Sequence, residues 1–184
     1  MLKAVIFDLG HTIMDELQYR EVPLRSRPAA LMPGVENMLP RIAAKIGIWA
    51  NTRRAKEAGV RRWLARAGVS HYFTWVVTSV QAGHRKPDPR FFAYALRRCS
   101  LEKDEILFVG NQLNTDVEGA FRFGIASVWI SGARFRSPDD TGSSFGVRPN
   151  YTIVGLEGLP ELFDKLQREK GTNRACDRRG AGLL

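Results

Sequence analysis

The stretch Phe7-Asp8-Leu9-Gly10-His11-Thr12 decides the fold, and the apolar run Ala4-Val5-Ile6 precedes it. The apolar run is typical of a short buried strand, and the glycine that follows it indicates a turn. An aspartate that leaves a strand of an α/β sheet stands where such folds place reactive groups. The carboxylate of Asp8 is therefore a candidate nucleophile, a candidate metal ligand, or both.

Short apolar segments alternate with amphipathic helical patterns along the rest of the chain. Val60, Trp63, Leu64 and Ala67 recur with the period of a helix that buries one face. This alternation predicts an α/β fold, a three-layer doubly wound parallel sheet of Rossmann-like type. The strands are expected at residues 3–7, 46–50, 75–78, 105–109 and 126–130.

Two helix starts carry recognisable capping signals. Asp88 before Pro89 predicts an N-cap, and Thr115 with Glu118 predicts a capping box. Residues 131–150 are rich in Ser, Gly, Asp and Pro and are expected to form a loop. We predict one α/β domain over residues 1–167, followed by a basic, disordered tail over residues 168–184.

The composition places the chain among ordinary globular proteins, with an unusual charge. It has 184 residues and a formal net charge of +9. No apolar stretch approaches the roughly 20 residues that span a bilayer, and Cys99 and Cys176 lack metal-site spacing, so we expect a cytoplasmic protein. Such a charge attracts polyanions at low salt. The basic residues are spread along the chain, which favours a solvated basic face and leaves nucleic acid binding open on charge alone.

Polar groups follow four of the expected strands. Because the carboxyl ends of the strands in a doubly wound sheet open on one crevice, these groups are expected to converge there. They are Asp8 after the first strand, Ala50-Asn51-Thr52 after the second, Lys86-Pro87-Asp88-Pro89 after the third, and Gly110-Asn111-Gln112-Leu113-Asn114-Thr115-Asp116 after the fourth.

The order of these segments resembles the haloacid dehalogenase (HAD) superfamily, over roughly residues 2–167. Most members of that superfamily are magnesium-dependent phosphatases. The resemblance implies that Asp8 takes the phosphoryl group as an aspartyl phosphate, and that Lys86 neutralises phosphate charge and keeps Asp8 ionised. It also implies a Mg²⁺ site made of Asp8, the Gly10 carbonyl, Asn111 and Asp116. Candidate phosphate-binding residues are Thr12, Asn51, Thr52 and Lys86.

Three positions depart from the superfamily pattern. Gly10 stands where the phosphatases carry an aspartate that acts as general acid and base, a role worth about 10²–10⁴ in rate. Ala50 replaces a hydroxyl residue that donates to phosphate, and Asn111 replaces a common aspartate. His11 is a candidate replacement acid, and the alternative is that it points elsewhere. Slow, restricted or lost catalysis is therefore expected.

The short interval between Asp15 and Leu39 leaves no room for the cap that many members insert there. A capless site is open to solvent and admits a phosphorylated substrate, including a macromolecular one. The sequence thus favours a slow Mg²⁺-dependent phosphatase over a catalytically impaired phosphate-binding or scaffold protein. An apolar patch over residues 13–24 leaves a homodimer contact open.

Overall fold

A central parallel sheet organises the chain in the computed structural model, which describes residues 1–16, 22–132 and 146–180. Its six strands run in the order β3-β2-β1-β4-β5-β6, and every pair of neighbours is parallel. The predicted α/β fold class is confirmed. The strands are β1 (Ala4–Phe7), β2 (Lys45–Ala50), β3 (Phe73–Thr78), β4 (Ile106–Gly110), β5 (Ala126–Ile130) and β6 (Tyr151–Ile153).

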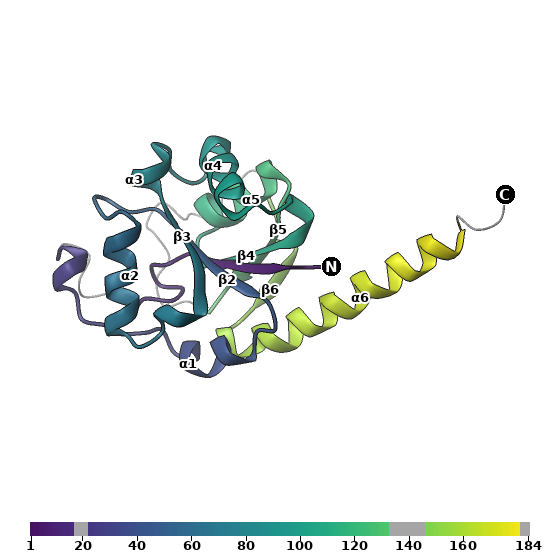
Figure 1. Cartoon of the computed structure of the whole chain (residues 1–184), viewed down its shortest axis with the longest axis horizontal. Coiled ribbons are helices and arrows are strands. Elements are labelled where there is room, and N and C mark those ends of the chain that lie inside the picture. Colours follow the sequence, from purple (N-terminus) through teal and green to yellow (C-terminus); the bar gives the residue numbers. More distant parts are fainter. Residues whose placement is uncertain (17–21, 133–145, 181–184) are drawn as a thin grey trace.

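Helices cover both faces of the sheet (Figure 1). Successive side chains of a strand point to opposite faces, so Phe7 packs in one core and Ile6 in the other. The first core includes side chains of α1 (Val35–Met38), α2 (Glu57–Arg66) and α6 (Leu159–Gly180). The second lies under α4 (Pro89–Cys99) and α5 (Glu118–Phe123), with the short helix α3 (Ser79–Ala82) beside them.

The strand order changes direction between β1 and β4. From β1 the chain moves outward through β2 and β3, and it then returns to β4 on the other side of β1. The carboxyl ends of β1 and β4 therefore border a topological switch point, where ligands of open α/β sheets bind. Asp8 follows β1 directly, and Asn111 follows β4.

The predicted helix starts had different outcomes. Asp88 caps α4, because its side chain accepts a hydrogen bond from the Arg90 amide and Pro89 is the first helical residue. The predicted capping box at Thr115 and Glu118 is wrong. A π-helical turn (Leu113–Val117) precedes α5, and the Thr115 hydroxyl donates within that turn to the Gln112 side chain. This wider turn brings Asp116 toward the sheet.

Two further segments differ from the expectations. The sixth strand, β6, follows the loop region and extends the sheet beyond the five expected strands. The sequence predicts disorder from residue 168, whereas helix α6 continues to Gly180 and projects from the body of the molecule (Figure 1). Ile13 and Met14, part of the suggested dimer patch, are buried in the core, and residues 17–21 of that patch lie outside the described residues.

Candidate active site

A single buried lysine joins the two carboxylates at the switch point. The Lys86 ammonium donates to Asp8 Oδ1 at 2.7 Å, to Asp116 Oδ1 at 2.8 Å and to the Trp49 carbonyl at 2.8 Å. Only 3% of Lys86 and 1% of Asp116 is exposed, whereas Asp8 reaches the cleft described below. Three segments far apart in the sequence thus converge, as predicted from the strand ends.

The charges of the triad Asp8, Lys86 and Asp116 shift the pKa values of Lys86 and Asp116. Burial lowers the pKa of Lys86, but the carboxylates of Asp116 and Asp8 outweigh burial and the net shift is upward. Burial raises the pKa of Asp116 to about 6; Lys86 opposes that shift and the Asp8 charge adds to it. The ammonium is therefore firmly charged, as a group must be to offset a phosphoryl anion.

Asn51 positions the lysine through its backbone. Its side-chain amide donates to the Lys86 carbonyl at 3.0 Å and accepts from the Lys86 amide at 2.9 Å. The paired hydrogen bonds fix the Lys86 segment against the end of β2. Asn51, expected to bind phosphate, also lines the cleft, and its side-chain amide is bonded to the Lys86 backbone there.

Thr52 follows Asn51 at the cleft and is tied to α3. Its backbone amide donates to Ser79 Oγ at 2.9 Å, and Ser79 Oγ donates back to the Thr52 carbonyl at 3.1 Å. The Thr52 hydroxyl donates to the Ala55 carbonyl at 2.6 Å. Ser79 was missed by the sequence analysis, because its role depends on a contact between α3 and a loop 27 residues away.

Thr12 and Asn111 lie behind the carboxylates, not at the cleft surface. The Thr12 hydroxyl donates to Asn111 Oδ1 at 3.2 Å, and both residues are buried. The Asn111 carbonyl accepts from Trp129 Nε1 at 3.1 Å. Ala50 packs in the apolar core. Its side chain has no hydroxyl, so it cannot make the hydrogen bond to phosphate that the superfamily makes from this position.

A glycine lets Asp116 approach β4. A Cβ built on Gly110 would overlap Asp116 Oδ2 and lie 2.5 Å from its Cγ. The same Oδ2 accepts from the Gln112 amide at 3.1 Å. The carboxylate therefore occupies the space that any larger residue at position 110 would need.

The space next to Gly10 is filled in the same way by Glu16. A Cβ on Gly10 would overlap Glu16 Oε1 and lie 3.0 Å from its Cδ. The Glu16 carboxylate forms an ion pair with Arg27, whose Nε donates to the Val22 carbonyl at 2.8 Å. A carboxyl group thus stands beside the position where the general acid of the superfamily begins. The sequence analysis missed Glu16, because nothing in the spacing of residues 10 and 16 predicts this approach.

His11 does not take that place. It is 1% exposed, its backbone has a φ of 56°, and it is not among the residues that line the cleft. The alternative interpretation, that His11 points elsewhere, agrees with this placement.

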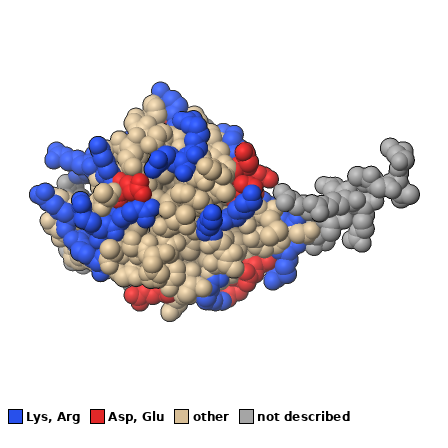
Figure 2. Space-filling view, in the orientation of Figure 1, with Lys and Arg blue, Asp and Glu red and all other residues tan. Residues whose placement is uncertain are grey.

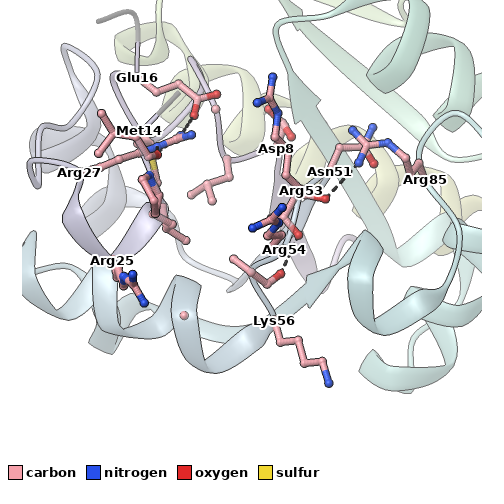
Figure 3. A pocket seen from close by; sticks show the side chains of 18 of the residues that line it. Asp8, Met14, Glu16, Arg25, Arg27, Asn51, Arg53, Arg54, Lys56 and Arg85 are labelled. Atoms are coloured by element: carbon pink, nitrogen blue, oxygen red, sulfur yellow. Dashed lines mark hydrogen bonds and ion pairs between the residues drawn. The ribbon is translucent and has the colours of Figure 1, made fainter. Parts of the chain in front are cut away.

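A cleft of about 1000 Å³ opens over Asp8. One wall is the segment that carries Arg25 and Arg27, and Arg53, Arg54 and Arg85 lie on the side of Asp8 and Asn51 (Figure 3). Figure 2 shows Lys and Arg side chains gathered at the end of the molecule where Figure 1 places α2. The cleft is therefore a cationic entrance to the aspartate.

The donors at its base fit a magnesium ion. Within the residues that the structure describes, no three His, Cys, Asp or Glu side chains are grouped to hold a metal. The charged donors are instead the carboxylates of Asp8 and Asp116, both bound to the Lys86 ammonium. The Asn111 amide and the Gly10 carbonyl are neutral candidate donors. Mg²⁺ prefers hard oxygen donors and keeps several waters, so a set with few protein charges suits it.

Comparison with known proteins agrees with this arrangement. A family model described as haloacid dehalogenase-like hydrolase matches residues 3–124. The chain belongs to this family. Asp8, Lys86 and Asp116 all lie within the residues that match the HAD-like hydrolases.

Individual relatives of this HAD-like hydrolase include phosphatases. The chain is 31% identical over 137 residues to the pyrimidine 5′-nucleotidase YjjG of Escherichia coli, covering 73% of this chain and 57% of that protein. It is 37% identical over 117 residues to a glyceraldehyde 3-phosphate phosphatase of Methanopyrus kandleri, covering 60% and 47%. The chain thus spans about half the length of the curated relatives it matches.

A solved structure of an uncharacterized protein from Listeria monocytogenes serotype 4b superposes with a TM-score of 0.79 at 26% identity. The superposition covers 91% of this chain and 99% of the Listeria protein.

Within the described residues, none of the helices has both the length and the apolar character needed to cross a membrane.

Proposed function

We propose that this HAD-like hydrolase is a Mg²⁺-dependent phosphatase that works through an aspartyl phosphate on Asp8. The observation that carries the proposal is the Lys86 ammonium held at 2.7 Å from Asp8 and 2.8 Å from Asp116 at the switch point of the sheet. Relatives that are named phosphatases support a phosphorylated substrate.

The chain's own residues supply most of the chemistry. Asp8 reaches the cleft and attacks the phosphoryl group, while Lys86 and the surrounding arginines offset the charge of the group being transferred. Asn51 holds Lys86 in register with Asp8. Asp8, Asp116, Asn111 and the Gly10 carbonyl would hold Mg²⁺, which neutralises phosphate charge when bound.

We further propose that the site has no cap and that turnover is slow. Between β1 and α1 the described residues form only a 3₁₀ turn (Leu24–Ser26) and connecting segments. An open cleft excludes water less well than a closed one, which weakens its electrostatic assistance. The absence of an aspartate at position 10 removes a factor of about 10²–10⁴.

A second candidate, an impaired phosphate-binding protein, is favoured by two placements. Ala50 is buried in the apolar core, and the Asn111 amide oxygen is engaged by Thr12. Hydrolysis of an aryl phosphate, with and without Mg²⁺, separates the two functions. The phosphatase predicts metal-dependent turnover that Asp8→Asn abolishes; the impaired protein predicts phosphate binding with no turnover above the Asp8→Asn background.

A further inference from the structure

The cleft carries more positive charge than a single phosphoryl group needs. Its described lining includes two carboxylates, Asp8 and Glu16, against eight basic side chains. A phosphate monoester has at most two negative charges, and a magnesium ion would already balance them. The basic lining residues are Arg25, Arg27, Arg53, Arg54, Lys56, Arg62, Arg85 and Lys86.

The basic walls are anchored to the fold. The Arg66 side chain on α2 donates to the Arg27 carbonyl at 2.8 Å and to the Leu24 carbonyl at 3.3 Å. Trp63 Nε1, also on α2, donates to the Pro28 carbonyl at 2.9 Å. On the other side, Arg85 donates to the Thr52 carbonyl at 3.0 Å. The cationic walls are therefore positioned before a ligand arrives, which reduces the entropy lost on binding.

In the described cleft, no carboxylic acid stands at position 10, where HAD phosphatases carry the group that protonates a departing alkoxide. Gly10 has no side chain, and Glu16, which fills its space, is engaged as a carboxylate by Arg27. No histidine is among the described residues that line the cleft. A substrate whose leaving group is a weak base avoids this lack, because that group departs without being protonated.

The described lining also contains no aromatic side chain. Stacking on aromatic rings is a common way for proteins to hold nucleobases and single-stranded nucleic acid. The described lining therefore favours recognition through phosphate groups, and the cleft volume of about 1000 Å³ is that of a small-molecule site.

Together these features point to one substrate class. We propose that the site removes the terminal phosphoryl group of a phosphoanhydride chain, either a nucleoside triphosphate or inorganic polyphosphate. This inference rests on the proposed phosphatase function. Such a substrate brings several anionic groups to the basic walls, and its leaving group is a phosphate, which is a far weaker base than an alkoxide.

The chemical steps balance without another reactant. An oxygen of Asp8 attacks the terminal phosphorus, the bond from phosphorus to the bridging oxygen breaks, and its electron pair leaves with the shortened chain. Water then attacks the same phosphorus, the bond to Asp8 breaks, and orthophosphate is released. Glu16, whose side chain lines the cleft beside Gly10, accepts the proton of that water.

Steady-state kinetics with four substrates test the proposal on the full chain with Mg²⁺. The substrates are ATP, inorganic tripolyphosphate, glycerol phosphate and an aryl phosphate. We expect kcat/KM for at least one phosphoanhydride to exceed that for glycerol phosphate by about 10²-fold, the size of the missing acid catalysis. Equal kcat/KM values for ATP and tripolyphosphate would show that the cleft recognises the phosphate chain. A higher kcat/KM for ATP would show that the nucleoside also contributes to recognition.

A double variant, Arg54→Gln with Arg62→Gln, tests the basic walls. We expect it to lower kcat/KM for tripolyphosphate about tenfold or more, and that for the aryl phosphate much less, since charge attraction scales with substrate charge. Arg97→Gln with Arg122→Gln removes the same charge from exposed positions outside the cleft and should leave the ratio unchanged. Calorimetry on Asp8→Asn should show tripolyphosphate binding more tightly than orthophosphate.

The outcomes separate this inference from the proposed function. Asp8-dependent hydrolysis of the aryl phosphate without a preference for phosphoanhydrides over glycerol phosphate overturns the inference alone. The same holds if both double variants lower kcat/KM for tripolyphosphate equally. No turnover of any substrate above the Asp8→Asn background removes the proposed function and this inference with it.

Discussion

The carboxylate of Glu16 occupies the space that a side chain at Gly10 would need, since a Cβ on Gly10 would lie 3.0 Å from Glu16 Cδ. A residue six positions away thus brings a carboxyl group to the place where HAD phosphatases start their general acid. The substitution at position 10 and the position of Glu16 therefore belong together. Two variants test this relationship directly.

Gly10→Asp should restore an acid but crowd Glu16. Because Glu16 is a flexible side chain, the new aspartate can displace it, at the cost of the ion pair with Arg27. We expect turnover of glycerol phosphate to rise about tenfold or more, and to rise further when Glu16→Gln accompanies Gly10→Asp. Gly10→Asn, of equal size but without an acidic proton, is the control. An equal gain from Gly10→Asn would refute a role in proton transfer.

Glu16→Gln alone should slow the hydrolysis of the aspartyl phosphate and not its formation. Without a base for the attacking water, the intermediate accumulates and the first turnover outruns the later ones. Rapid-quench measurement with an aryl phosphate should show a burst whose amplitude approaches the enzyme concentration. Glu36→Gln, on the exposed face of α1, serves as control and should show wild-type kinetics. A variant with unchanged burst and steady-state rate would remove Glu16 from the reaction.

Lys86→Met should abolish activity and destabilise the fold. It leaves Asp8 and Asp116 facing each other without the ammonium that contacts both, and breaking a buried ion pair typically costs about 3–5 kcal/mol. Urea denaturation at neutral pH measures the loss in free energy of unfolding. Lys165→Met removes an exposed lysine and should change stability little. Comparable stability of the two variants would contradict the structural role of Lys86.

The raised pKa of Asp116 predicts a pH-dependent stability in the absence of metal. The native state holds the Asp116 proton with a pKa of about 6, against 3.8 as the ordinary value, so native protein binds the proton more tightly than unfolded protein. This group therefore stabilises the fold below pH 4, and the contribution declines as pH rises through 6, by up to about 3 kcal/mol. Denaturation of wild type and Asp116→Asn at pH 4.5 and 7.5, in chelator, isolates the effect. Parallel pH profiles would contradict it.

The sequence predicted the parts of the site that depend on strand ends. Asp8, Lys86 and Asp116 converge as expected, because parallel strands present their carboxyl ends to one edge of the sheet. The helical start at Thr115 was misjudged, since a hydroxyl three residues before a glutamate is typical of a capping box whether or not the turn is π-helical. Local spacing does not reveal that difference.

Contacts between distant side chains escaped prediction altogether. The bonds of Ser79 to Thr52, the pairing of Glu16 with Arg27, and the gathering of arginines from three segments all depend on how loops pack. From the sequence alone the basic residues indicate a solvated basic face, because their positions in the chain are far apart. Packing against α2 is what brings Arg25 and Arg27 opposite Arg53 and Arg54 (Figure 3).

The most direct test of the central claim is whether Asp8 itself carries the phosphoryl group. Wild type and Glu16→Gln are mixed with an aryl phosphate and Mg²⁺, quenched in acid within the first turnover, digested and analysed by mass spectrometry. The account predicts one added phosphoryl group on the peptide that contains Asp8, more of it in Glu16→Gln, and none in Asp8→Asn. Turnover of the substrate with no phosphorylated Asp8 peptide in either protein would contradict it.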